Sequence, residues 1–209
     1  MKRSVKNNDT DDGEEQKEPE IESHPFKPWL PEGARLLMLG TFPPAPKRWC
    51  MSWYYPNFQN DMWRIFGLLF FKDKGHFVLP GEKRFDLPAI QDFLRLHHIA
   101  IFDTALRIRR TKGTASDKDL EIVEPTDLDA LLQHLPQCRG VLTAGRLATK
   151  VFTDHFGINA KDLKMGDSIA FPFEGRQIRL YRMPSSSRAY PMAVEKKAVF
   201  YKKMFDEVL

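Results

Sequence analysis

Short apolar runs alternate along the chain with longer segments in which apolar residues recur every three or four positions. The apolar runs of strand length are Leu36–Leu39, Ile99–Asp103 and Gly140–Thr143, and residues 168–182 alternate around Glu174-Gly175 as in a hairpin. Five segments have apolar residues at helical spacing, and each begins near a residue suited to a helix start: Asn60, Asp86, Thr126, Gly145 or Pro191. Strands that alternate with helices in this way predict an α/β fold with a mostly parallel sheet and helices on both faces.

Three loops follow the carboxyl ends of predicted strands. They are Gly40–Pro46, Asp103–Arg110 and Met183–Tyr190. In a parallel sheet these loops converge on one edge, where α/β proteins bind ligands. Soon after the first loop comes a dense set of aromatic residues: Trp49, Trp53, Tyr54, Tyr55 and Phe58. We therefore expect a crevice that binds something planar, such as a base.

Charge divides the chain into a short acidic segment and a basic body. Residues 1–24 hold four Lys or Arg and eight Asp or Glu, with few apolar residues, so we expect a disordered acidic tail. Residues 25–209 hold 28 basic and 20 acidic residues and have the length of one domain. A basic body favours a polyanion such as DNA, although this excess of charge is also compatible with a role in solubility alone.

Cysteine usage and hydropathy exclude several classes of protein. Cys50 and Cys138 lie far apart without Cys-x-x-Cys spacing, so neither a zinc site nor an iron–sulfur cluster is expected. No apolar stretch has transmembrane length, and the N-terminus is charged. We expect a cytoplasmic monomer without metal or other cofactor, which associates with the nucleoid when bound to DNA.

Three segments together resemble the uracil-DNA glycosylase superfamily. Gly-Thr-Phe-Pro at 40–43 and Met-Pro-Ser-Ser-Ser at 183–187 are similar to its two signature motifs. The segment Tyr54–Trp63 is similar to an element of the hypoxanthine and mismatch-specific branches, and the resemblance spans roughly residues 25–205. It implies a three-layer αβα sandwich around a mostly parallel sheet of about four strands.

The resemblance also implies a function, the removal of a deaminated base from DNA. The base (uracil, hypoxanthine or a related one) is flipped into a pocket, and its N-glycosidic bond is hydrolysed. Base-binding residues would be Thr41, Phe42, Tyr54, Tyr55 and Asp103, with Tyr55 as the stacking ring and Tyr54 as its substitute. DNA-binding residues would be Pro184, Ser185, Ser186, Ser187 and Arg188; Arg188 would fill the gap in the duplex or contact phosphate.

Two positions depart from the family pattern. Phe42 stands where the first motif offers a carboxylate or amide for water, and Met183 stands where the second motif often has a His. We therefore expect the catalytic groups to be Asn60, which would position water, or Asp103. An ionised Asp103 accepts hydrogen bonds only, which suits bases with N–H edges and would repel the O4 of uracil. We therefore expect deaminated purines or a broader range of bases rather than strict uracil specificity.

Other interpretations of these residues remain open. Asn60 can be a helix cap alone, and Asp103 can be a structural carboxylate held by Arg107, Arg109 or a loop amide. Without the usual catalytic groups, the protein can also be a catalytically silent DNA or lesion binder. A hydrolase of free nucleosides or nucleotides is a third possibility on the same scaffold.

Overall fold

A computed structural model of the chain describes residues 20–112 and 117–209. Most of the predicted tail therefore lies outside the described residues. Its last part does not, because Ile21–Ser23 form strand β1, whose backbone pairs antiparallel with β4 (Ala105–Arg110). The folded domain thus includes residues 21–24, which we assigned to the tail because of the acidic residues around them.

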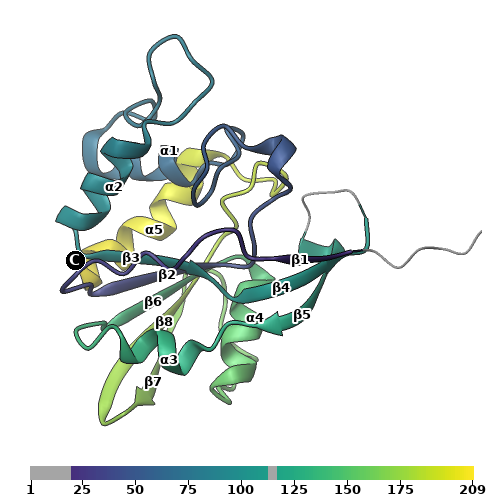
Figure 1. Cartoon of the computed structure of the whole chain (residues 1–209). Helices are drawn as coiled ribbons and strands as arrows, with labels where there is room; N and C mark the ends of the chain where they lie inside the picture. Colours follow the sequence, from purple (N-terminus) through teal and green to yellow (C-terminus); the bar gives the residue numbers. More distant parts are fainter. Residues whose placement is uncertain (1–19, 113–116) are drawn as a thin grey trace, which may run out of the picture.

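The central sheet has the strand order β3-β2-β6-β8-β7 (Figure 1). These strands are β2 (Leu36–Gly40), β3 (Ile99–Asp103), β6 (Gly140–Ala144), β7 (Ser168–Phe173) and β8 (Arg176–Met183). Neighbours in the order β3-β2-β6-β8 run parallel, and β7 pairs antiparallel with β8. The fifth strand is the first half of the predicted hairpin at 168–182.

Helices cover both faces of this sheet, which confirms the predicted three-layer α/β architecture (Figure 1). One face carries α1 (Met62–Phe66) with its π-helical continuation Gly67–Phe71, α2 (Leu87–Leu96) and α5 (Val194–Val208). The other carries α3 (Leu128–Gln133) and α4 (Arg146–His155). Strands β2, β3 and β6 are buried along their whole length, because helices cover them from both sides.

Two predicted helix starts are corrected. The carboxylate of Asp127, not the Thr126 hydroxyl, caps α3 by accepting from the amide of Ala130 at 3.0 Å. The Thr126 hydroxyl instead donates to the Asp103 carbonyl at 2.7 Å. Helix α5 begins at Val194 and not at Pro191.

A second sheet, here called the side sheet, joins β1, β4 and β5 (Leu120–Pro125) in the order β1-β4-β5. A short 3₁₀ turn, Asp117–Asp119, leads into β5, where the sequence suggested only a polar loop. Cross-strand ion pairs join Arg109 to Glu121 at 3.0 Å and Arg107 to Glu124 at 3.6 Å. The side sheet follows directly from the end of β3 and so lies beside the carboxyl edge of the central sheet (Figure 1).

Within the described residues, no helix is both long enough and apolar enough to cross a membrane.

Candidate functional site

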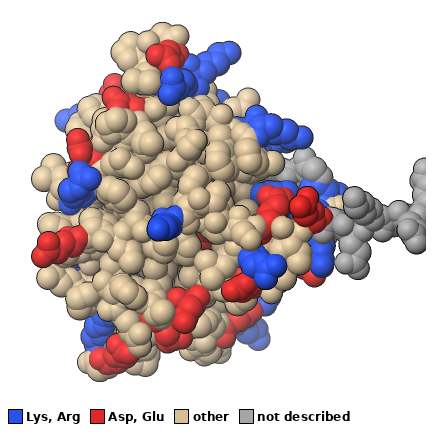
Figure 2. Space-filling model, in the orientation of Figure 1, with Lys and Arg blue, Asp and Glu red and all other residues tan. Residues whose placement is uncertain are grey.

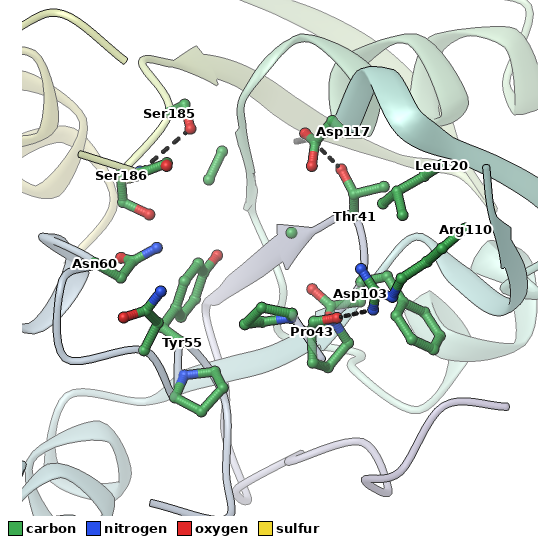
Figure 3. Close-up of a pocket in the computed structure, with 17 residues that line it drawn as sticks. Thr41, Pro43, Tyr55, Asn60, Asp103, Arg110, Asp117, Leu120, Ser185 and Ser186 are labelled. Atoms are coloured by element: carbon green, nitrogen blue, oxygen red, sulfur yellow. Dashed lines mark hydrogen bonds between the residues drawn. The ribbon is translucent and has the colours of Figure 1, made fainter. Parts of the chain in front are cut away.

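A cavity of roughly 110 Å³ lies at the carboxyl ends of β2, β3 and β8 (Figure 3). A single water needs about 10–15 Å³, so the space suits a small molecule or ring system. Its lining includes residues of all three predicted loops, namely Gly40–Pro44, Asp103, Arg110 and Ser185–Ser187. The convergence expected from the strand pattern is therefore confirmed.

Asp103 lies in this cavity with one of its carboxylate oxygens already bound. Oδ2 is 3.0 Å from Nε2 of His24, and the two side chains are 8% and 3% exposed. Oδ1 lies against the Gly40 backbone, since a Cβ built on Gly40 would be only 2.4 Å from it. The carboxylate therefore has one oxygen fixed by an imidazole and one beside the glycine.

His24 fixes Asp103, a role the sequence did not suggest. Its Nδ1 lies 2.9 Å from the Phe26 carbonyl and 3.2 Å from the Phe26 amide. The ring also packs on Phe42 and Phe102, with centroid distances of 5.2 and 4.8 Å. His24 belongs to a segment we predicted to be disordered, and the apolar residues that follow it were the one available sign of order.

The structure shows whether Arg107 or Arg109 holds Asp103, as one interpretation of the sequence suggested. Arg107 and Arg109 pair with Glu124 and Glu121 across the side sheet, and the side chain that holds Asp103 is His24. A histidine–carboxylate pair in a cavity is compatible with a structural role and with a catalytic one.

Tyr55 and Tyr54 have different environments. Tyr55 lines the cavity, and its buried hydroxyl has no hydrogen-bond partner among the described residues. Burial, with the nearby charge of Asp103, raises the pKa of Tyr55 well above its usual value, so the phenol stays a protonated donor. Tyr54 is buried outside the cavity, and its hydroxyl donates to the Lys27 carbonyl at 2.8 Å. Its predicted contact with a base does not fit this position.

The N-cap of α1 is Asp61 rather than the predicted Asn60, which lies one residue earlier and lines the cavity. The Asn60 Oδ1 accepts from the Met62 amide at 2.9 Å, in the first turn of α1. The side chain nevertheless lines the cavity beside Tyr55 (Figure 3). Because Oδ1 is engaged by the backbone, the Nδ2 amide group is the one available to a ligand.

The serine loop, Ser185–Ser187, forms one wall of the cavity, where all three serines lie. The ammonium group of the fully buried Lys197 donates to the Ser187 carbonyl at 2.8 Å and to Asp61 Oδ2 at 3.0 Å. The Asp61 amide donates to the Ser186 carbonyl at 2.8 Å. An internal ion pair therefore ties the serine loop to the start of α1.

The other two predicted DNA-binding residues lie outside the cavity. Pro184 lines a neighbouring groove, and its carbonyl accepts from the Tyr201 hydroxyl at 2.9 Å. Arg188 has a side chain that is 50% exposed and contacts Asp61 at 3.2 Å. Arg188 is thus anchored next to the serine loop and accessible from solvent.

The wall opposite the serine loop carries a carboxylate that the sequence did not suggest (Figure 3). Asp117 lines the cavity, and its Oδ2 accepts from the Thr41 hydroxyl at 3.2 Å. Burial and the charge of Asp103 raise the pKa of Asp117, while the Thr41 hydrogen bond opposes that rise. Phe42, also in the lining, offers no polar side-chain group. We missed Asp117 because it follows a polar stretch typical of surface loops.

Arg110 supplies a cation to the same lining. Its Nε donates to Glu22 at 2.7 Å, and its terminal nitrogen donates to the Pro43 carbonyl at 2.6 Å. Strand β1 and the residue after it therefore contribute two contacts at this edge, Glu22 to Arg110 and His24 to Asp103. Among the described residues, no group of three or more His, Cys, Asp or Glu is arranged to hold a metal ion.

A larger groove of roughly 690 Å³ adjoins the cavity and shares Asp117, Ser185 and Ser187 with it. We call it the basic groove because its lining includes Lys118, Arg146, Lys150 and Arg182. Basic side chains beside a serine loop suit a phosphate backbone better than they suit a neutral ligand.

Comparisons with known proteins support the fold. No protein-family model matches the chain, and no curated protein matches it. Among solved structures, one match is an NMR structure from Methanosarcina acetivorans described as a "putative Uracil DNA glycosylase". It has a TM-score of 0.62 and 19% sequence identity, and the match covers 90% of this chain and 98% of that one. At this identity the likeness establishes a shared fold.

Proposed function

We propose that the protein is a DNA N-glycosylase that flips a deaminated base into the cavity and hydrolyses its N-glycosidic bond. The observation that carries this proposal is the meeting of Tyr55, Asn60, Asp103 and three serines around one small cavity. The shared fold with a protein described as a putative uracil-DNA glycosylase supports it.

The cavity residues suit a flipped base. Tyr55 offers an aromatic ring and an unpaired hydroxyl donor, and Asp103 offers a carboxylate whose orientation His24 fixes. An ionised carboxylate accepts from N–H groups and repels carbonyl oxygens. Hypoxanthine, whose ring N1–H has one neighbouring carbonyl, is therefore preferred to uracil, whose N3–H lies between two carbonyls.

The same groups suit the transition state. Departure of the base leaves positive charge on the sugar, and a carboxylate held nearby stabilises that charge without transferring a proton. Asp103 takes this role. The Asn60 Nδ2 group, left available because Oδ1 accepts from the Met62 amide, donates to the attacking water and orients it.

The serine loop binds the DNA backbone on either side of the flipped nucleotide. Hydroxyl groups and backbone amides are common phosphate contacts, and Lys197 holds this loop in place. Arg188 contacts phosphate or enters the gap left in the duplex.

The proposal also covers the organisation of the chain. A single glycosylase domain, which includes β1, follows the acidic tail.

Strand cleavage assays test the proposal. Duplexes that hold uracil, hypoxanthine or xanthine are incubated with excess protein, and alkali then cleaves any abasic sites. We expect scission of at least one substrate, fastest with a deaminated purine, and loss of that activity in Asp103→Ala. Unchanged excision of every base by Asp103→Ala would exclude its proposed role.

A second candidate function is a catalytically silent lesion binder. Phe42 and Met183 favour it, because neither supplies the polar group that the resemblance leads one to expect. Lesion binding without scission of any substrate would support the silent binder. Absence of salt-dependent DNA binding would contradict both candidates and favour a hydrolase of free nucleosides.

A further inference from the structure

Asp117 reaches the cavity from the side sheet, an element separate from the strands that carry Asp103 and Thr41. Its Oδ2 is held by the Thr41 hydroxyl at 3.2 Å. No other hydrogen bond to this carboxylate occurs within residues 20–112 and 117–209, so Oδ1 remains available to a ligand or a water. One hydrogen bond thus orients the Asp117 side chain and leaves its second oxygen able to accept another.

The surroundings leave space in front of this carboxylate. Gly145 has φ +107°, and a Cβ built on it would lie 3.7 Å from Asp117 Oδ2 and 3.7 Å from the Ser185 Cβ. Asp117 and the serine loop therefore face each other across a glycine that carries no side chain. A sugar–phosphate held by the serines would lie on the Asp117 side of the cavity.

The other polar groups of the cavity are less suited to take a proton from water. Asp103 has one oxygen bound to His24, and its other oxygen lies against Gly40. Asn60 presents its donor group, since Oδ1 accepts from the Met62 amide. Phe42 has no polar atom on its side chain. Asp117 is the acceptor that remains.

We propose that Asp117 is the catalytic base of the glycosylase reaction, activating the water that attacks the sugar. The inference rests on the proposed function and adds a residue to it. The Asp117 carboxylate accepts a proton from water as the water oxygen forms a bond to C1′. The C1′–N bond breaks, its electron pair leaves with the base, and the base anion then takes up a proton. The products are an abasic sugar and the free base, with no change of oxidation state.

A raised pKa is consistent with this role. General bases work best when their pKa lies near the working pH, and burial moves the pKa of Asp117 in that direction. Asp103, Arg110 and Tyr55 share the cavity with it, and Lys118 follows it in the basic groove. Of these, the charge of Asp103 raises the pKa of Asp117 further.

Single-turnover excision of the wild type's best substrate tests the inference. Removal of a general base typically costs about 10²–10⁴ in rate, so Asp117→Asn should excise roughly 100-fold or more slowly. Its Kd for a duplex with a tetrahydrofuran abasic analogue should stay within a factor of about three, because the Thr41 contact survives. Asp119→Asn, in the same 3₁₀ turn but outside the cavity lining, is the matched control and should keep the wild-type rate.

Chemical rescue separates a catalytic from a structural role. In Asp117→Ala, added formate should restore part of the excision rate, because a small carboxylate can occupy the vacated space and accept the proton. Formate should have no such effect on Asp103→Ala.

The outcomes distinguish this inference from the proposed function. A wild-type rate in Asp117→Asn would overturn the inference and leave the glycosylase function intact. The same holds for a slow Asp117→Asn combined with equal loss of abasic-site binding and no formate rescue. A wild type that excises no base would overturn both.

Discussion

At the residue scale, the absence of a side chain at Gly40 leaves the space that the Asp103 carboxylate occupies in the cavity. A methyl group at residue 40 would be 2.4 Å from Asp103 Oδ1 and 3.5 Å from the Tyr55 hydroxyl. Gly40→Ala should displace the carboxylate, slow excision at least tenfold and cost about 1–3 kcal/mol of stability. Single-turnover kinetics and urea unfolding measure both effects, and a wild-type excision rate would contradict the role given to Asp103.

The contact between His24 and Asp103 is a second determinant at the residue scale. His24→Phe keeps a ring in the aromatic pocket but removes the 3.0 Å hydrogen bond. It should leave a buried carboxylate oxygen unpaired, at a cost of about 1–3 kcal/mol, and slow excision roughly tenfold or more.

Thermal unfolding and single-turnover kinetics check the His24 prediction. His134→Phe is the control, since His134 is exposed at the end of α3 and its side chain hydrogen-bonds to the Ala130 carbonyl of its own helix. If both variants excise at the wild-type rate, His24 serves packing alone.

The raised pKa of Asp117 makes a prediction about stability and pH. Because the folded-state pKa lies above the unfolded value, ionisation of Asp117 disfavours the folded state as pH rises through that window. Asp117→Asn should therefore unfold at a higher temperature than wild type at neutral pH. The difference should disappear below about pH 4, where the carboxyl group is protonated in both states.

Calorimetry from pH 3 to pH 8 measures this difference. A stabilised variant with slowed excision is the pattern expected when a site retains a carboxylate for activity at the expense of stability. An Asp117→Asn variant less stable than wild type at neutral pH would indicate a structural carboxylate instead.

Sequence patterns identified some of these residues and missed others for physical reasons. Asp103, Asn60 and the serine loop lie at ends of buried strands or at a helix start, where periodicity gives their position. His24 and Asp117 each follow a polar stretch of the sequence, and contacts between distant positions place them in the cavity. His24 hydrogen-bonds to a residue 79 positions later, and Asp117 to one 76 positions earlier. No local pattern encodes such pairings.

At the scale of elements, the serine loop depends on the internal ion pair of Lys197 and Asp61. Lys197→Met removes the ammonium group while keeping much of the side-chain volume. Loss of one partner of a buried pair should cost about 3 kcal/mol, the low end of the usual range, because Arg188 still contacts Asp61. Weaker binding to abasic-site DNA should accompany the loss, since the serine loop is no longer held.

Denaturant unfolding and DNA binding are the measurements for Lys197→Met. Lys196→Met is a close control, because Lys196, the residue before Lys197 in α5, is exposed. Equal stability of the two variants would mean that the ion pair contributes no more than a surface charge does.

The side sheet shows where element prediction failed. Burial does not alternate regularly along residues 105–110, and residues 120–125 are half-buried or exposed. Both strands carry charged side chains, and a polar stretch of sequence separates them. Arg and Glu are poor indicators of strands taken alone and become favourable only when paired across β4 and β5. The buried parallel strands needed no such partner information, since continuous apolar runs marked each of them.

At the scale of the whole molecule, the positive charge is dispersed on the face seen in Figure 2. There, Lys and Arg side chains stand apart from one another among neutral and acidic residues. The basic groove brings several cations next to the serine loop instead. Net charge in the sequence therefore indicated an anionic partner without locating the surface that would bind it.

Salt dependence tests whether Arg188 contacts phosphate. Arg188→Ala should weaken binding to all duplexes alike and reduce the slope of log K against log salt by about 1. Arg84→Ala is the control, because Arg84 is an exposed arginine paired with Glu82 away from the site. An unchanged slope, with binding weakened only for duplexes that hold a lesion, would favour a role in filling the gap of the flipped base.

The path of β1 has a practical consequence for protein engineering. Residues 21–23 form an edge strand of the side sheet and lead into the cavity edge at His24, whereas the C-terminus lies at the opposite end of the central sheet (Figure 1). A reporter or affinity tag fused after Leu209 would leave the cavity edge unobstructed. A tag fused close to Ile21 would crowd the strand that carries His24, so the C-terminal fusion is the better format for immobilising this protein on a sensor surface.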